Sequence, residues 1–137
     1  MSTYLLPEEE KPASIAAKHV YVMANGDLRL SANQNCWAAQ QAMEADISMA
    51  LEAVGWVVVR AHPFNVEAKH GFIASQREGM DVFARLAPKA PLIVAEAVWQ
   101  YSHHVLHGLM THEGPILTLA NWPIHQSWYL YRILLYH

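Results

Sequence analysis

Polar and aromatic side chains follow each of four short apolar runs in the sequence. They are Asn25, Gly26, Asp27 and Arg29 after the first run, Arg60, His62 and Asn65 after the second, Glu96, Trp99, Gln100 and Tyr101 after the third, and Asn121 and Trp122 after the fourth. Aromatic faces stack on the C–H surfaces of a sugar, and arginine and asparagine donate directional hydrogen bonds to its hydroxyls. The pattern predicts a sugar site if the four runs end at one edge of a common sheet. The alternative is the ordinary polarity of loops.

Two further groups of residues have types that could do chemistry. His103 and His107 are four residues apart, a spacing that can bring two imidazoles of one helix to a metal ion. Glu113 is the nearest acid, at a helix end of unknown geometry, so histidines without a metal are the favoured interpretation. Cys36 would need a neighbouring base to act as a nucleophile, and we expect it to be a buried structural residue. The sequence contains neither G-x-G-x-x-G nor G-x-x-x-x-G-K-[ST], so neither motif argues for a nucleotide.

The four apolar runs, at residues 19–24, 56–59, 91–95 and 116–119, predict β-strands. Their continuous rather than alternating hydrophobicity is typical of strands buried on both faces. Between them, apolar residues recur every three or four positions and predict three helices. The first begins at Asn33 or Asn35 as N-cap and stops at Gly55. The second runs from about Phe72 to a point before Pro88, and the third covers 98–109 and ends near 114.

This alternation of strands and helices predicts an α/β fold. Strands joined through helices form a parallel sheet with right-handed crossovers. We therefore expect three layers, flavodoxin-like or Rossmann-like, with a parallel sheet of four or five strands and helices on both faces. We divide the chain into a flexible acidic lead-in (1–14), an α/β domain (15–122) and a C-terminal tail (123–137).

The composition of the 137-residue chain limits the classes of function that it can have. The net charge is −3, so no basic surface argues for nucleic acid. One cysteine, no apolar run of 18 residues and an acidic N-terminus favour a cytoplasmic protein without a membrane partner. Charged residues make up 15%, below the roughly 25% of soluble domains. We therefore expect an exposed apolar patch that meets other domains and promotes self-association.

The tail departs from the preceding pattern. Residues 123–137 contain no acid and no glycine, and they include Trp128, Tyr129, Tyr131 and Tyr136. We expect that the chain ends early with an aberrant or truncated terminus. The alternative is a fifth edge strand or a contact with a partner.

Several segments carry a resemblance to a known family. They are residues 90–105, 114–122, 25–29 and 62–64. Together they resemble the N-terminal region of the L-fucose/L-arabinose isomerase family, and most closely the bacterial fucose-isomerase-like proteins. The resemblance covers roughly residues 15–122.

The resemblance implies a role in carbohydrate metabolism. Family members are longer, oligomeric aldose–ketose isomerases that use Mn²⁺ and acidic residues to move a proton between C1 and C2. Their metal ligands and proton-transfer acids lie in later domains, so we expect this chain alone to bind no cofactor and to have no catalytic residue. Their first domain lends substrate contacts to a neighbouring subunit's site. Matching positions make Arg29 and Trp99 substrate-binding residues, with Asn25, Glu96 and Tyr101 as neighbours.

Two other functions stay open at this point. One is a stand-alone flavodoxin-like module that binds a polyol without catalysis. If residues 123–137 pack as a strand against the sheet, this module is favoured. If their aromatic side chains are exposed, a fragment of a longer isomerase is favoured. The other is a histidine-rich metal binder built on His103 and His107.

Overall fold

The computed structural model describes residues 14–97, 102–120 and 134–135. In chain order the elements are β1 (His19–Met23), α1 (Leu30–Glu52), β2 (Val57–Arg60), α2 (Gln76–Arg85), β3 (Leu92–Glu96), a 3₁₀ turn η1 (Ser102–His104), α3 (Leu106–Thr111), β4 (Ile116–Ala120) and β5 (Leu134–Leu135). The sheet order is β2-β1-β3-β4-β5, with β1 to β4 parallel and β5 antiparallel to β4. The prediction of an α/β fold with a parallel sheet is confirmed.

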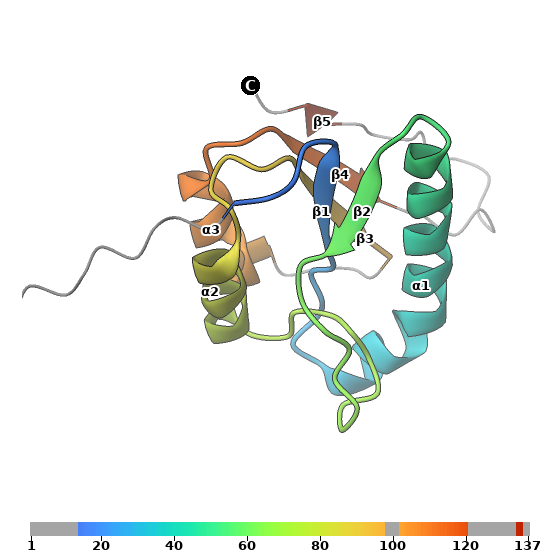
Figure 1. Cartoon of the computed structure of the whole chain (residues 1–137). Coiled ribbons are helices and arrows are strands. Elements are labelled where there is room, and N and C mark those ends of the chain that lie inside the picture. The colour runs from blue at the N-terminus through green and yellow to red at the C-terminus, as the bar shows by residue number, and fades with distance from the viewer. Residues whose placement is uncertain (1–13, 98–101, 121–133, 136–137) are drawn as a thin grey trace, which may run out of the picture.

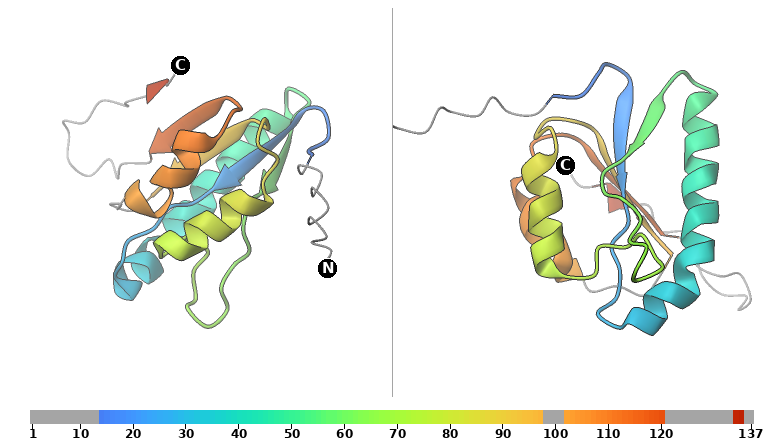
Figure 2. Two further views of the ribbon diagram at one scale, coloured as in Figure 1. Left: turned by 90° about the vertical axis from the view of Figure 1, so that its left-hand side faces the viewer. Right: turned by 60° about the horizontal axis from the view of Figure 1, so that its bottom comes forward.

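Helices cover both faces of the sheet (Figures 1 and 2). On one face, Val22 and Ile93 pack against Met43 and Ile47 of α1. On the other face, the strands pack against residues of α2, η1 and α3, including Val82, Leu86, Val105 and Leu109. All five residues of β3 are buried, because this strand lies in the middle of the sheet between the two layers.

The first helix ends where the sequence predicts. The carbonyl of Leu51 accepts from the backbone N–H of Trp56, and that of Glu52 accepts from Gly55. These bonds form the Schellman pattern, in which the C′ residue takes a left-handed conformation, and Gly55 has φ +85°. The predicted start is wrong, since α1 begins at Leu30 and Asn33 lies inside its first turn.

The second helix begins later than predicted. Ser75 is its N-cap: its Oγ accepts from the backbone N–H of Glu78 at 3.2 Å, and Glu78 Oε2 accepts from that of Ala74 at 2.8 Å. This reciprocal pair is a variant of the capping box, which satisfies donors that helix geometry leaves open. Phe72 therefore lies in the loop before α2 rather than on the helix.

Two other predictions need correction. β2 is not buried on both faces, because it lies at an edge of the sheet and Val57 is exposed. The third helix is shorter than predicted: it is divided into η1 and α3 and ends at Thr111. Its predicted first residues, 98–101, lie outside the described part of the chain. Within the tail, the structure describes only β5, which pairs with β4 at Leu117 and Thr118.

Candidate functional site

The carboxyl ends of β1 and β3 form the switch point of the sheet. From β1 the chain crosses to β2 on one side, whereas β3 continues to β4 on the other. Ligands of open α/β sheets bind at this position. Met23 pairs with Val94, so Asn25 and Glu96, two residues further on, leave the sheet next to each other. Both are buried.

An ion pair fixes the corner between β1 and α1. The Asp27 carboxylate accepts from Arg29 through the backbone N–H at 2.8 Å, Nε at 3.0 Å and Nη2 at 2.8 Å. Asn33 holds the Asp27 backbone with two hydrogen bonds of 2.7 and 2.9 Å. Asp27 is fully buried, whereas 68% of the Arg29 side chain is exposed. The hydrogen bonds from Arg29 lower the pKa of Asp27 to about 2. The Arg29 guanidinium is therefore held in one orientation at the carboxyl edge of the sheet.

Glu96, the last residue of β3, is a buried carboxyl. Its Oε2 has no hydrogen-bond partner among the residues that the structure describes. Desolvation by burial raises the pKa of Glu96 to about 8, so the group is neutral at pH 7. Gln40 of α1 fixes the backbone on both sides of it, since its Nε2 donates to the Ala95 carbonyl at 3.0 Å and its Oε1 accepts from the Ala97 N–H at 2.9 Å.

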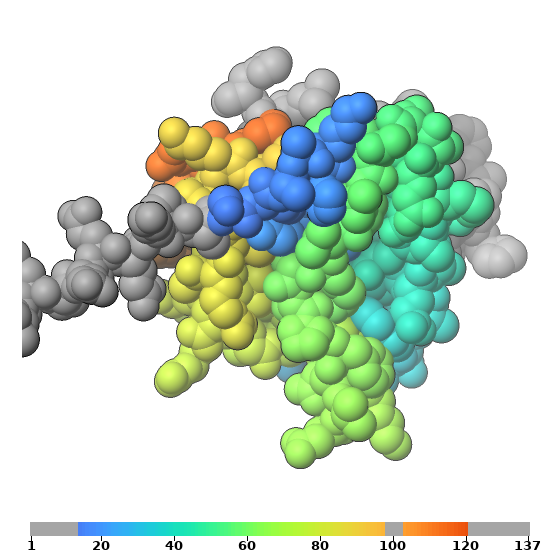
Figure 3. Space-filling view, viewed as in Figure 1, coloured from blue at the N-terminus to red at the C-terminus, as the bar shows by residue number. Residues whose placement is uncertain are grey.

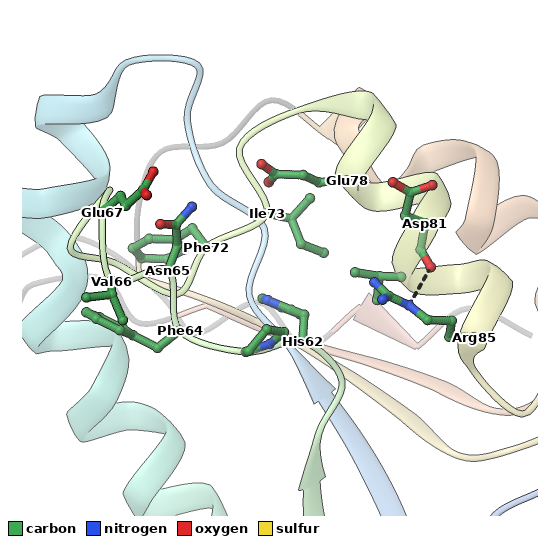
Figure 4. Close-up of a pocket in the computed structure, with 12 residues that line it drawn as sticks. His62, Phe64, Asn65, Val66, Glu67, Phe72, Ile73, Glu78, Asp81 and Arg85 are labelled. Atoms are coloured by element: carbon green, nitrogen blue, oxygen red, sulfur yellow. Dashed lines mark hydrogen bonds between the residues drawn. The ribbon is translucent and has the colours of Figure 1, made fainter.

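A cavity of about 480 Å³ opens between the β2–α2 loop and α2 (Figure 4). It is lined by His62, Pro63, Phe64, Asn65, Val66, Glu67, Phe72, Ile73, Glu78, Asp81, Val82 and Arg85. It lies at the carboxyl edge of the sheet, because its lining residues bond to the chain just after β1. His62 Nε2 accepts from the Ala24 N–H at 3.1 Å, and the Ile73 carbonyl accepts from the Gly26 N–H at 2.8 Å. The β2–α2 loop projects from this end of the molecule (Figure 3).

His62 is held neutral in a single tautomer. Burial, together with the charge of Arg60, lowers its pKa to about 3. Since Nε2 accepts from the backbone of Ala24, the ring proton lies on Nδ1. Nδ1 then faces Arg60 Nη1 at 3.4 Å as a second donor, so this contact is not a hydrogen bond. The imidazole is a neutral wall of the cavity.

Arg60 ties the cavity's loop to the first helix. Its Nε donates to Glu44 of α1 at 2.9 Å, its Nη2 donates to the Gly71 carbonyl at 2.6 Å, and its Nη1 donates to the His62 carbonyl. The guanidinium also lies 5.2 Å from the ring centre of Trp37, a cation–π distance. Both ends of the loop are thereby attached to α1.

The cavity has an apolar wall and a polar wall. Phe64, Phe72 and Ile73 come from the loop and are drawn opposite the α2 residues in Figure 4. On α2, Asp81 offers a carboxylate, and Arg85 donates from Nε to the Asp81 carbonyl at 3.1 Å. This combination can bind a small molecule that has both apolar C–H surface and hydroxyl groups.

The structure brings together only part of the predicted rim. His62 and Asn65 line the cavity, Asn25 and Glu96 meet at the strand ends, and Arg29 lies at the β1–α1 corner. Neither Asn25, Glu96 nor Arg29 lines the cavity. Trp99 and Tyr101, with Gln100, Asn121 and Trp122, lie outside the described residues.

Sequence reasoning missed the α2 side of the cavity. Glu78, Asp81, Val82 and Arg85 recur at steps of three and four, so they share one helical face. That spacing is present in the sequence, but charged residues at such steps are also typical of a solvated helix face.

No metal centre is formed by the described residues, where no three of His, Cys, Asp and Glu gather closely enough to hold an ion. Cys36 is half-buried rather than fully buried. No helix among the described residues is long and apolar enough to cross a membrane.

Comparison with protein-family models, with curated proteins and with solved structures gives no match. Membership of the isomerase family therefore stays a prediction from the sequence.

Proposed function

We propose that this chain is a sugar-binding N-terminal domain of the aldose–ketose isomerase type, which supplies substrate contacts and not the chemistry. The cavity at the carboxyl edge carries the sugar-binding part of this proposal. Its volume falls within the roughly 300–1,000 Å³ of small-molecule sites. The isomerase part rests on the resemblance of residues 15–122.

The two walls of the cavity suit an uncharged polyhydroxylated ligand. Phe64, which is 45% exposed, offers apolar ring surface for the C–H face of a sugar, and Phe72 is buried in the same wall. Asn65, Asp81 and Arg85 supply amide, carboxylate and guanidinium groups for its hydroxyls. Each such hydrogen bond contributes about 0.5–1.5 kcal/mol, and more where the protein group is charged.

Arg29 offers a second point of contact at the same edge. Its bonds to Asp27 hold the side chain in place before a ligand arrives. A side chain that is already ordered avoids about 0.5–1.5 kcal/mol of ordering cost on binding.

Sugar binding is tested by titrating the isotopically labelled chain with L-fucose and following amide resonances. We expect shifts in the β2–α2 loop and α2, and weaker binding of about three- to tenfold in Asp81→Asn, which removes a charged acceptor. Glu113→Gln is the matched control, because Glu113 is exposed and does not line the cavity. An absence of shifts with L-fucose, L-arabinose and L-fucitol would contradict the proposal.

The role of Arg29 is tested by Arg29→Ala in the same titration. We expect binding to weaken by about tenfold, whereas Arg77→Ala, on an exposed position of α2, leaves it unchanged. Purified chain supplied with Mn²⁺ and L-fucose should yield no ketose. Ketose formation by the chain alone would show that it supplies the chemistry after all.

One observation favours the stand-alone polyol-binding module as a second candidate. Leu134 and Leu135 pair with β4, so part of the tail joins the sheet. Removal of residues 123–137 should lower the unfolding temperature if the tail belongs to the module. An unchanged unfolding temperature favours the isomerase domain.

A further inference from the structure

Glu96 is a buried carboxyl at the switch point, and its Oε2 makes no hydrogen bond within the described structure. We propose that Glu96 is a hydrogen-bond donor to an uncharged hydroxyl or carbonyl oxygen of a ligand bound over the ends of β1 and β3. This inference rests on the proposed sugar-binding function and, since Glu96 does not line the cavity, adds a contact beside the cavity at the same edge of the sheet.

The backbone fixes the direction in which Glu96 points. Within β3, Leu92 and Val94 pack with α2 and α3, whereas Ile93 and Ala95 pack with α1. Successive side chains of a strand alternate between faces, so Glu96 lies on the α2 and α3 side. By the same alternation, Asn25 follows Met23 on that side, which places the two polar side chains together.

The strand end at Glu96 is rigid. Gln40 bonds to the peptide groups on both sides of it, and β3 is hydrogen-bonded to both β1 and β4. The carboxyl therefore cannot leave its buried position by a small backbone movement. A rigid polar group requires no ordering when it meets a ligand.

An unsatisfied buried polar atom costs about 1–3 kcal/mol, and folded proteins contain few of them. Glu96 Oε2 is such an atom among the described residues. The neighbouring Asp27 carboxylate already accepts three hydrogen bonds from Arg29. A ligand oxygen over the strand ends would give Glu96 the partner that it lacks within the described part of the chain.

The protonation state fits a donor. Burial raises the pKa of Glu96 to about 8, and a neutral carboxyl carries one O–H donor. Among the described residues, the charged and titratable groups around this end of the sheet are Asp27 and Arg29 of the β1–α1 corner, Arg60 and His62 after β2, His103 and His104 of η1 and Glu78 of α2. The pKa of Asp27 is about 2, and burial lowers that of His104, so neither changes charge above pH 7. A neutral O–H donor suits an uncharged hydroxyl or carbonyl oxygen of the ligand.

The experiment compares L-fucose binding by the full chain, Glu96→Gln and Glu96→Leu at pH 7 and pH 9.5, by resonance shifts. Glutamine keeps a neutral N–H donor and leucine removes it. We expect Glu96→Leu to bind about tenfold more weakly at pH 7, and the unaltered chain to weaken by a similar factor at pH 9.5. Glu96→Gln should bind within about threefold of the unaltered chain at pH 7, with no such pH dependence. Glu113→Gln is the control and should behave as the unaltered chain.

Several outcomes overturn the inference. If Arg29→Ala weakens binding but Glu96→Leu does not, Glu96 is not a donor and the sugar-binding function stands. If Glu96→Gln keeps the pH dependence of the unaltered chain, another group titrates, and the inference again fails alone. If the unaltered chain binds none of the sugars, both fail. Where Glu96→Leu does not fold, the pH profiles of the other two chains decide.

Discussion

Glu96 and His62 are both buried at the carboxyl edge, and both are held in their neutral forms. Burial has opposite consequences for the two, because one is an acid and the other a base. The two residues therefore have opposite effects on how the stability of the fold changes with pH.

Glu96 should make the fold less stable as the pH rises. The pKa of Glu96 is about 8 in the folded chain and near 4.5 in the unfolded chain, so between these values only the unfolded state loses the proton. Each pH unit in this window lowers the free energy of unfolding by up to about 1.4 kcal/mol. Glu96→Gln, which cannot ionise, should therefore raise the unfolding temperature more at pH 8 than at pH 5. Equal shifts at both values would show that Glu96 is ionised in the fold.

His62 should limit stability in acid. Its pKa is about 3 in the folded chain and near 6.5 in the unfolded chain, so below pH 6.5 the unfolded state takes up a proton that the folded state refuses. Stability should fall as the pH drops through this window. His62→Gln, which can still accept from Ala24, should reduce the difference in unfolding free energy between pH 4 and pH 7. The control is His107→Gln, at an exposed position of α3, which should keep the full difference.

Residue-scale features of the site were only partly predictable. The polarity that follows each apolar run predicted that His62, Asn65 and Glu96 lie at the carboxyl edge of the sheet, where the structure has them. It could not show that Glu96 lacks a partner, since that depends on which side chains the fold brings within reach. Asp81 was missed because one acid on an amphipathic helix carries no sign of the loop that faces it.

At the scale of elements, η1 packs directly on α2. A Cβ at Gly79 of α2 would overlap the carbonyl of His104 in η1, so only glycine permits this approach. Through this contact, η1 packs with α2 and α3 in the layer that covers one face of the sheet.

Gly79→Ala should therefore destabilise the fold, although alanine is the better helix former by about 1 kcal/mol. We expect a net loss of about 1–3 kcal/mol in denaturant unfolding, because η1 must move. Gly55→Ala is the matched comparison: its Cβ would meet nothing within 4 Å, and only the positive φ of +85° costs energy, about 1–2 kcal/mol. A stabilised Gly79→Ala chain would show that η1 does not pack there.

The elements themselves were largely predictable, but their places in the sheet were not. β1, β3 and β4 lie within about one residue of their predicted bounds. β2 has the same continuous hydrophobicity as β3, yet one is an edge strand and the other is central. Local hydrophobicity does not encode strand order, which depends on the direction that each crossover takes. The third helix was overestimated because its apolar spacing continues across the break between η1 and α3.

For the whole molecule, β2 forms one edge of the sheet. Edge strands expose unpaired backbone groups that can pair with another chain, and lysine on such a strand discourages this. β2 has three successive valines, and Val57 is 46% exposed.

We therefore expect concentration-dependent self-association that Val57→Lys reduces. Light scattering after gel filtration measures the average mass over a range of concentrations. Val66→Lys is the control, because Val66 is more exposed, at 78%, but lies in the β2–α2 loop. Equal effects of the two substitutions would assign the association to general surface hydrophobicity rather than to the strand edge.

The placement of β1 also has a consequence for synthesis on the ribosome. β1 is made first, yet its second neighbour β3 ends at Glu96, more than 70 residues later. A nascent chain that has not yet released β3 lacks the central strand and also η1 and α3, which follow β3 and complete the layer that α2 begins. Such a chain holds β1 and β2 with part of their apolar side chains uncovered, and it is then open to proteases and chaperones.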